Sequence, residues 1–480
     1  MNALREKIPP AVSEMRRLFD LQRAAFAAER YPSYLARQDR LARLKALLTR
    51  NEARFAAAVD SDFGDRSEHE TRLAELYIVA AEIADAQRQL KHWMRTEHVA
   101  TPLHLQPGRA RIERQPVGVA GIISPWNYPV QLALAPALGA LAAGNRVLLK
   151  PSEVTPATSA LLRELVAASF MEDEFAVVLG DADVGRAFAR LPFDHLFFTG
   201  STAVGRQVAL AAAENLTPVT LELGGKSPAL FAPDADFDLA APRLVSGKLL
   251  NAGQTCIAPD YVLVQDDRAE ALVAAIRTAA DRLYPSYAAN PDYTAIVSER
   301  HYRRLTALVD DARAKGATVV ALNPAKEKPA AASRKLLPTL VLGVTADMAV
   351  MREEIFGPLL PIETYETIDD AIAKINARPH PLAFYYFGRE GVRSAKVLRE
   401  TLAGGVTVND TLWHFAHKHL PFGGVGASGK GAYHGEASFL AFTHRKPVFV
   451  QSRLAAAKFL YPPYGAAFDG MLALLRKLTA

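Results

Sequence analysis

The chain has 480 residues; half of them are hydrophobic and 22% are charged, and 56 Lys and Arg against 51 Asp and Glu leave a net charge of +5. This composition excludes a mainly disordered chain, and so small an excess of charge gives little support to a nucleic-acid or membrane partner. The length suits two or more domains, each with its own buried core. The single cysteine, Cys256, excludes an intramolecular disulfide and favours a reducing compartment.

The amino-terminal sequence MNALREKIPP lacks the unbroken apolar run of a secretory signal, so we expect a cytoplasmic protein. The uncharged stretch between Arg114 and Arg146 is long enough to cross a bilayer. However, four prolines interrupt it, which predicts a buried strand, a turn and a helix, and no stable membrane anchor.

In chain order, the pattern is helical from about residue 11 to residue 94, with leucines three and four residues apart. Short apolar runs then alternate with Ala- and Leu-rich segments, which predicts a parallel sheet with ligands at the carboxyl ends of its strands. The expected strands are residues 117–123, 146–150, 175–179, 195–198 and 219–222.

A second α/β stretch follows, with expected helices at residues 299–315 and 368–376. Its expected strands are residues 228–232, 261–265, 339–342, 362–366, 383–387 and 405–409. The segments 98–112 and 442–450 fit neither core, and we expect a projecting two-stranded element that needs a partner to cover its edge. The last residues predict a turn and one short amphipathic helix.

Three segments nearly match known ligand-binding motifs, but each fails a requirement of its motif. The segment 424–429, GVGASG, has the GxGxxG spacing but lies too near the carboxyl terminus to open a nucleotide-binding half, so a flexible loop is the better interpretation. The GKS at 225–227 resembles the end of a phosphate-binding loop, but Thr220 stands where that motif needs glycine. His414, His417 and His419 have only Asp410 nearby, so we expect surface or pocket histidines and no metal site.

Two other segments predict a nucleotide site. FTGSTAVG at 198–205 follows an expected strand and opens an expected helix, whose N–H groups and dipole suit a pyrophosphate. LLKPSE at 148–153 ends another strand and places Lys150, Ser152 and Glu153 at the same edge, where a ribose needs donors and acceptors. Each feature alone is ordinary, and together they favour a nucleotide.

A lone cysteine is most often a small core residue, but Cys256 has suggestive neighbours. Glu222 ends one expected strand, and Asn127 follows another, so both lie at the predicted ligand edge. A thiol nucleophile, a carboxylate base and an amide donor are the groups that acyl transfer through a thioester requires.

Together these motifs resemble the aldehyde dehydrogenase superfamily over nearly the whole chain. The matching segments are SPWNYP, LLKPSE, FTGSTAVG, LELGGKSP, GQTCIAPDY, EEIFGP and PFGGVGASG. The DFGDRSEHET segment and the YPPYG tail look most like the class 3 branch, and within it the coniferyl aldehyde dehydrogenases.

The resemblance implies an α/β fold with a Rossmann-type cofactor domain, a second α/β catalytic domain and a projecting β oligomerisation element. The implied ranges are 1–97 and 113–222 for the cofactor domain, 223–430 for the catalytic domain, 98–112 and 431–452 for the oligomerisation element, and 453–480 for a tail. A homodimer is the expected assembly, in which the strand of one subunit extends the sheet of the other.

By the same resemblance, Cys256 would be the nucleophile, Glu222 the general base and Asn127 a donor to the oxyanion. The cofactor would be NAD, with NADP possible, because the carboxylate of Glu153 repels a 2′-phosphate while Lys150 can offset that repulsion. The implied cofactor residues are Ser124, Trp126, Lys150, Ser152, Glu153, Phe198, Gly200, Ser201, Val204, Leu223, Gly224, Glu354 and Phe356.

The implied reaction is the oxidation of an aldehyde to the acid through a cysteine thiohemiacetal and a thioester that water hydrolyses. Tyr128, Trp413 and Phe422 are candidates to line the substrate mouth for an aromatic aldehyde such as coniferyl aldehyde, or a medium-chain aliphatic one, although each could equally be core. One alternative is a CoA-acylating relative, against which Glu222 argues. Another is a non-catalytic binding protein on the same fold.

Overall fold

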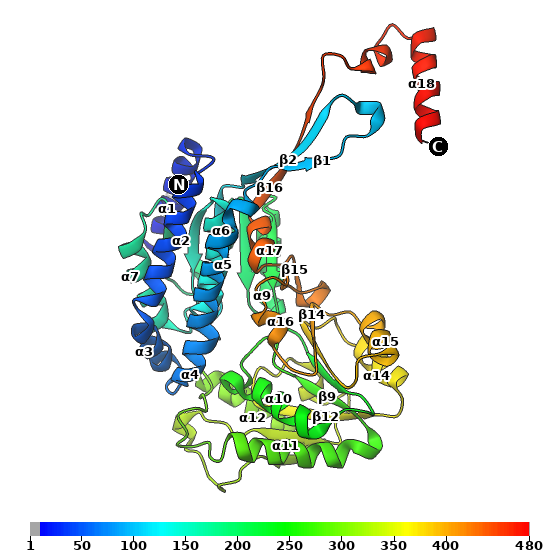
Figure 1. The fold of residues 1–480 in the computed structure, drawn as a ribbon. Coiled ribbons are helices and arrows are strands. Elements are labelled where there is room, and N and C mark those ends of the chain that lie inside the picture. The colour runs from blue at the N-terminus through cyan, green and yellow to red at the C-terminus, as the bar shows by residue number, and fades with distance from the viewer. Residues whose placement is uncertain (1–9, 480) are drawn as a thin grey trace, which may run out of the picture.

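Three β-sheets organise the protein, which is described here by a computed structural model covering residues 10–479 (Figure 1). The amino-terminal segment 1–9, where we expect no secretory signal, and residue 480 lie outside the described residues. The sheets confirm the predicted α/β class with two α/β units and a projecting β element.

The six-stranded sheet brings the ends of four strands to one edge. In spatial order its strands are β15 (Gly429–Lys430), β7 (Val219–Glu222), β6 (His195–Thr199), β3 (Val119–Ile123), β4 (Arg146–Lys150) and β5 (Phe175–Val177). All are parallel except β15, which runs antiparallel to β7. Ile123 lies opposite Lys150, and Thr199 lies opposite Glu222, so these strands end level with one another.

Helices from the amino-terminal segment pack on this sheet, as their leucine spacing predicts. Leu41, Leu44 and Leu48 of α2 are fully buried, and α6 is buried on all sides because it lies beneath α2, α5 and α17. The helices beside this sheet are α1 (Pro10–Ala28), α2 (Tyr34–Thr49), α3 (Glu52–Phe63), α4 (Glu68–Glu70), η1 (Thr71–Tyr77, a π-helical turn), α5 (Ile78–Trp93), α6 (Gln131–Ala143), α7 (Pro156–Ser169), α8 (Ala182–Ala189), α9 (Thr202–Ala213) and α17 (Gly435–Ala441).

The second sheet has seven strands. In spatial order they are β10 (Thr318–Ala321), β11 (Thr339–Leu342), β12 (Leu359–Tyr365), β9 (Tyr261–Gln265), β8 (Pro228–Phe231), β13 (Ala383–Phe387) and β14 (Gly405–Val408). Its helices are α10 (Phe237–Leu249), α11 (Ala269–Leu283), α12 (Glu299–Ala314), α13 (Ala349–Arg352), α14 (Ile368–Asn376), α15 (Val392–Glu400) and α16 (Trp413–Ala416). β10, a four-residue antiparallel edge strand, was not predicted from the sequence. Its residues are exposed or partly exposed, so the strand lacks the long apolar run that marks a buried strand.

Short turns connect several of these elements. They are η2 (Leu103–Leu105), η3 (Leu250–Gly253), η4 (Asp266–Arg268), η5 (Ala331–Ser333), η6 (Gly426–Ser428) and η7 (Ala456–Leu460).

The third sheet projects from the body, and it has three strands where we expected two. β2 (Arg109–Pro116) lies between β1 (Glu97–Val99) and β16 (Thr443–Val450), and α18 (Ala466–Thr479) lies beyond it (Figure 1). We expected the whole of 431–452 in this element, but α17 packs against α6 instead, with Ser438 against Gly139. The division of the chain into domains stays a prediction.

Among residues 10–479, each helix is too short or too polar to cross a membrane.

Candidate active site

The level ends of β3, β4, β6 and β7 form the edge where the predicted site residues gather. The chain order of the strands reverses between β3 and β6, because β4 and β5 continue on one side and β7 lies on the other. In open parallel sheets, ligands bind at the carboxyl ends of the strands beside such a reversal.

Lys150 and Glu153 form an ion pair at the end of β4. The Lys150 Nζ lies 2.6 Å from the Glu153 Oε2, and Lys150 is buried while the Glu153 side chain is 45% exposed. Burial acts to raise the pKa of Glu153, but the hydrogen bond and charge of Lys150, together with a backbone hydrogen bond, outweigh it and hold that pKa below its usual value. Ser152 is used locally, since its Oγ accepts a hydrogen bond from the Val154 N–H at 3.2 Å. The pair presents a cation and a carboxylate to a ligand at this edge.

The turn from β6 into α9 packs tightly. A Cβ on Gly200 would lie 2.6 Å from the ring of Phe198, and one on Gly205 would lie 2.5 Å from the Leu223 side chain. Ser201 caps α9 by accepting a hydrogen bond from the Val204 N–H at 3.4 Å. The other N–H groups of this first turn are available to an anion.

Cys256 follows a strained loop. Asn251 and Ala252 have left-handed φ values of +54° and +51°, and Gly253 has +76°. Residues with side chains adopt this region at a cost of about 1–3 kcal/mol, so the surrounding contacts must hold the loop. Burial, assisted by the carboxyls of Glu354 and Glu222, raises the pKa of the Cys256 thiol.

Glu222 ends β7, and its carboxyl is buried. Neither of its oxygens has a hydrogen-bond partner among the described residues, and the residue is 2% exposed. Burial raises the pKa of Glu222 well above its ordinary value. An unpartnered buried carboxyl is costly for folding and is typical of a functional group.

Asn127 lies against the Cys256 loop. Its side-chain Nδ2 donates to the backbone carbonyl oxygen of Gln254 at 3.1 Å. The backbone carbonyl oxygen of Asn127 accepts from the side chains of Arg66 and Asn251. The structure therefore brings together the three groups that the sequence singled out for thioester chemistry.

Glu354 approaches the same edge from the second sheet. A Cβ on Gly224 would collide with its carboxylate, so only glycine permits this approach. Burial and the charge of Asp260 raise the pKa of Glu354 to about 8, and its Oε1 has no hydrogen-bond partner in the described chain. Phe356, at φ +52°, meets the ring of Trp126 edge-on at 5.3 Å between centroids.

The backbone around Glu354 is held by residues that sequence reasoning missed. The Asp260 Oδ2 accepts from the Ile355 N–H at 2.8 Å, and the Lys226 Nζ donates to the Val350 and Glu353 carbonyl oxygens at 2.8 and 3.0 Å. Both residues lie in segments already recognised, GGKSP and APDY, but contacts across 95 to 127 residues leave no local pattern.

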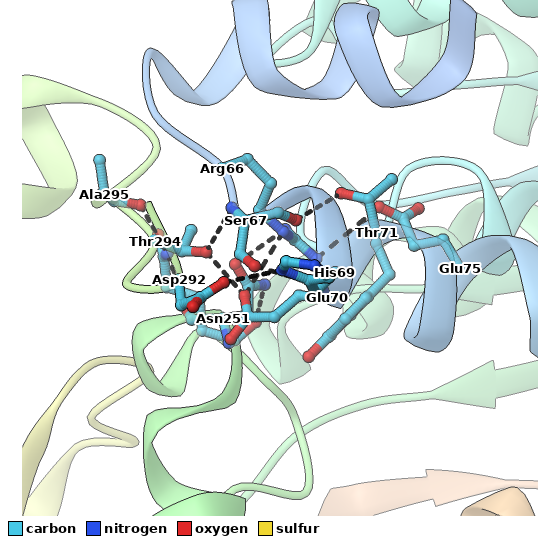
Figure 2. A network of polar contacts seen from close by, with 12 residues as sticks. Arg66, Ser67, His69, Glu70, Thr71, Glu75, Asn251, Asp292, Thr294 and Ala295 are labelled. Atoms are coloured by element: carbon cyan, nitrogen blue, oxygen red, sulfur yellow. Dashed lines mark hydrogen bonds and ion pairs between the residues drawn. The ribbon is translucent and has the colours of Figure 1, made fainter. Parts of the chain in front are cut away.

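A second group that the sequence missed is a buried polar network around Arg66 (Figure 2). The Arg66 guanidinium lies between Glu70 and Glu75, with nitrogen–oxygen distances of 3.8 and 3.7 Å. Its Nη1 donates to the Asn251 Oδ1 at 2.8 Å and to the Asn127 carbonyl oxygen at 3.2 Å. The DFGDRSEHET segment contains Arg66 and Glu70, yet its partners lie 61 and 185 residues away.

The predicted substrate residues do not lie together. The Tyr128 hydroxyl bonds the Thr255 Oγ1 at 2.7 Å, next to Cys256. Phe422 is buried and stacks on the rings of His414 and His434, whereas Trp413 is 64% exposed. Their role in binding a substrate stays a prediction.

Of the three neighbouring histidines, His417 and His419 meet edge-on with 6.0 Å between ring centroids, while His414 lies in different surroundings. His414 is buried and its Nδ1 lies 2.8 Å from the Thr407 Oγ1, while His419 lies 3.7 Å from Asp85. Within residues 10–479, we find no group of three or more His, Cys, Asp or Glu side chains arranged to hold a metal ion.

The edge suits a dinucleotide cofactor. It offers the Lys150–Glu153 pair for a ribose, the open first turn of α9 for a pyrophosphate, and the unpartnered Glu354 oxygen for the second ribose. Ser124 follows β3, and its N–H donates to the Lys150 carbonyl oxygen at the end of β4. Its buried hydroxyl has no hydrogen-bond partner in the described chain. The donors and acceptors therefore match the polar groups of a dinucleotide in kind.

Comparison with known proteins gives a consistent result. The sequence model of the "Aldehyde dehydrogenase family" matches residues 11–448. A "Probable coniferyl aldehyde dehydrogenase" of Pseudomonas aeruginosa is 50% identical over 461 residues, which cover 96% of each chain. A solved structure described as the substrate-bound state of Staphylococcus aureus AldH is 39% identical with a TM-score of 0.91, over 96% of this chain and 99% of that one. A mutant of Pseudomonas syringae aldehyde dehydrogenase C, complexed with NAD+ and octanal, is 30% identical with a TM-score of 0.81, over 91% and 89% of the two chains.

Proposed function

The chain belongs to the aldehyde dehydrogenase family, and we propose that it oxidises an aromatic aldehyde such as coniferyl aldehyde through thioester chemistry at Cys256. As a member of that family it is an NAD(P)-dependent oxidoreductase that acts on aldehydes. One observation carries the proposed chemistry: a thiol, a buried carboxyl with a raised pKa and an amide donor lie at the ligand edge of the sheet.

In the proposed first step, the Cys256 thiol releases its proton to solvent, the thiolate sulfur attacks the aldehyde carbon, and the carbonyl oxygen becomes an oxyanion. The side-chain amide of Asn127 donates to that oxygen together with the Cys256 backbone N–H. The bound nicotinamide supplies the acceptor for the hydride of the former aldehyde C–H bond. Cys256 then carries the acyl group as a thioester.

In the proposed second step, Glu222 removes a proton from water, which attacks the thioester. The acid leaves and the Cys256 thiol is restored. A carboxyl with a raised pKa is a stronger base once it has ionised, which suits this step near neutral pH. A CoA-acylating enzyme would not need that base.

The aromatic substrate is proposed from the name of the relative at 50% identity, which shares 96% of the chain. Tyr128 is the best placed of the three candidate residues, because its hydroxyl contacts the residue before Cys256. The second candidate substrate is a medium-chain aliphatic aldehyde, which the octanal complex of the P. syringae relative favours.

The test is a panel of aliphatic, benzylic and cinnamyl aldehydes, assayed with NAD and with NADP by the absorbance of the reduced nicotinamide. We expect the highest kcat/KM for cinnamyl aldehydes and free acid as the product without CoA. A requirement for CoA would contradict the hydrolytic mechanism, and a preference for octanal over all cinnamyl aldehydes would contradict the proposed substrate.

Glu153 should set the choice between NAD and NADP. Replacing it with glutamine removes the negative charge that opposes a 2′-phosphate, while Lys150 stays in place. We expect Glu153→Gln to shift the ratio of kcat/KM for NADP over NAD by about 10-fold toward NADP, from one charge contact worth on the order of 1 kcal/mol. Glu164→Gln, an exposed carboxylate on α7 paired with Arg54, is the control and should leave the ratio unchanged. An unchanged ratio in Glu153→Gln would remove Glu153 from cofactor selection.

We also propose a cytoplasmic homodimer. The outer strands of the projecting sheet, β1 and β16, each have a neighbour on one side within the described chain. An exposed strand edge pairs readily with another chain, so a second copy is the natural occupant. Light scattering of the purified protein tests this, and a monomer at micromolar concentration would contradict it.

A further inference from the structure

Arg66 belongs to the polar network of Figure 2 and donates hydrogen bonds to the two segments that carry Asn127 and Cys256. Arg66 is 4% exposed and belongs to the short connection between α3 and α4. Its Nη1 contacts the turn after β3 through the Asn127 carbonyl oxygen, and the loop before Cys256 through the Asn251 side chain.

Each contact continues toward a reacting group. The Asn251 Nδ2 donates to the Asn127 carbonyl oxygen at 2.9 Å and to the Gln254 carbonyl oxygen at 3.1 Å. The Gln254 oxygen also accepts from the Asn127 side-chain amide. The guanidinium carbon further lies 5.1 Å from the ring centroid of Tyr128, whose hydroxyl contacts Thr255. Arg66 therefore reaches the amide of Asn127 and the backbone beside Cys256 by separate routes.

Two carboxylates anchor the other side of the network. The Glu75 Oε2 accepts from the Val130 N–H at 2.7 Å, at the start of α6, which follows the Asn127 turn. The Glu70 Oε1 accepts from the Asn251 N–H at 3.0 Å, and its Oε2 accepts from the Thr294 hydroxyl at 2.6 Å. The two carboxylates stand five residues apart at a π-helical turn, whose i→i+5 repeat brings such residues to one face.

We propose that Arg66 is a positioning residue for aldehyde oxidation, which fixes the Asn127 amide and the Cys256 sulfur at the separation that thiohemiacetal formation requires. The inference rests on the proposed function. The loop 251–253 is left-handed over three successive residues, so it needs an outside contact to keep this shape. Arg66 supplies one such contact, at the Asn251 side chain, beside the Glu70 carboxylate that accepts from the Asn251 N–H.

The test compares Arg66→Met, Arg66→Lys and Arg37→Met. Methionine keeps much of the length of the side chain but has no N–H group, while lysine keeps the charge and ends one bond short of Nη1. Arg37 is the matched control, because it is also fully buried and donates to carbonyl oxygens of α6, but at the far end of that helix, at Ala142 and Ala143.

Two readouts separate positioning from stability: the single-turnover rate of NADH formation at saturating NAD, and the rate at which iodoacetamide alkylates Cys256, the single thiol. A displacement of about 1 Å costs about 100-fold in rate, so we expect that loss in Arg66→Met with the Kd for NAD little changed. Arg66→Lys should recover part of the rate. Alkylation of Cys256 should become faster in Arg66→Met as its loop loosens, and Arg37→Met should match the parent in both readouts after correction for the folded fraction.

A folded Arg66→Met with the parental rate and alkylation would overturn the proposal. If Arg66→Met does not fold, Arg66→Lys decides, and parental values in that variant, or failure of both to fold, also overturn it. If the parent protein oxidises no aldehyde, the proposed function fails, while the alkylation comparison still tests Arg66.

Discussion

Replacing Cys256 with alanine should abolish NADH formation, with kcat reduced by about 10⁴-fold or more, because the chain has no other thiol to form a thioester. NAD binding should persist, since the residues proposed for the cofactor lie at the ends of β4 and β6 and on the Glu354 loop. Stopped-flow absorbance measures the first effect, and calorimetric titration with NAD measures the second.

Cys256→Ser is the companion variant, because it keeps a small polar side chain in the same space with a far weaker nucleophile. It should be as inactive as Cys256→Ala while unfolding at a similar temperature. Turnover at the parental level in either variant would remove Cys256 from the reaction and return it to the role of a small core residue.

Replacing Glu222 with glutamine should slow hydrolysis of the thioester by about 10²–10⁴-fold, the usual contribution of a general base. Hydride transfer should be affected much less, because the thiol attacks before water does. A burst of NADH close to one per subunit should therefore precede slow turnover. Intact-protein mass spectrometry should show the acyl adduct on the single cysteine.

The pH dependence of this step follows from the raised pKa of Glu222. The active base is the carboxylate, and burial disfavours it, so its population grows as the pH rises through the raised pKa. Hydrolysis of the parental thioester should therefore accelerate as the pH rises through the raised pKa of Glu222 and level off once the carboxyl has ionised. In Glu222→Gln, the rate of hydrolysis should keep rising with pH and reach no plateau, since hydroxide alone would then drive hydrolysis.

Glu82→Gln is the matched control for Glu222→Gln. Glu82 is also a buried carboxyl, and burial together with Asp85 raises its pKa to about 8, but it lies on α5. This variant should hydrolyse its thioester at the parental rate. A missing adduct in Glu222→Gln, with hydride transfer as the slowed step, would contradict the general-base role.

Much of the fold could be predicted because its elements have strong local patterns. The buried strands 146–150 and 261–265 appear where continuous apolar runs predicted them, and α12 and α14 match their expected ranges within one residue. β15 could not be predicted, because two residues pair with β7 only after the chain has returned from more than 200 residues away.

Some residues of the candidate site could likewise be predicted from local sequence, and others could not. Cys256, Glu222 and Asn127 could be singled out because each lies in a recognisable segment and at the end or the turn of an expected element. Trp413 and Phe422 are both aromatic residues in or near recognised segments, yet Trp413 is exposed and Phe422 is buried. Whether an aromatic ring reaches a pocket depends on what packs over it, and the sequence pattern does not carry that information.

The sequence alone therefore determined most of the strands and helices, the family resemblance and the candidates for the reacting groups, because these depend on residue type and on near neighbours. The tertiary structure decided that the strands end level, that the Glu222 carboxyl is buried without a hydrogen-bond partner among the described residues, and that Arg66 joins the Asn127 turn to the Cys256 loop. These facts depend on the register of strands and on contacts across 61 to 185 residues, which exist only once the chain has folded.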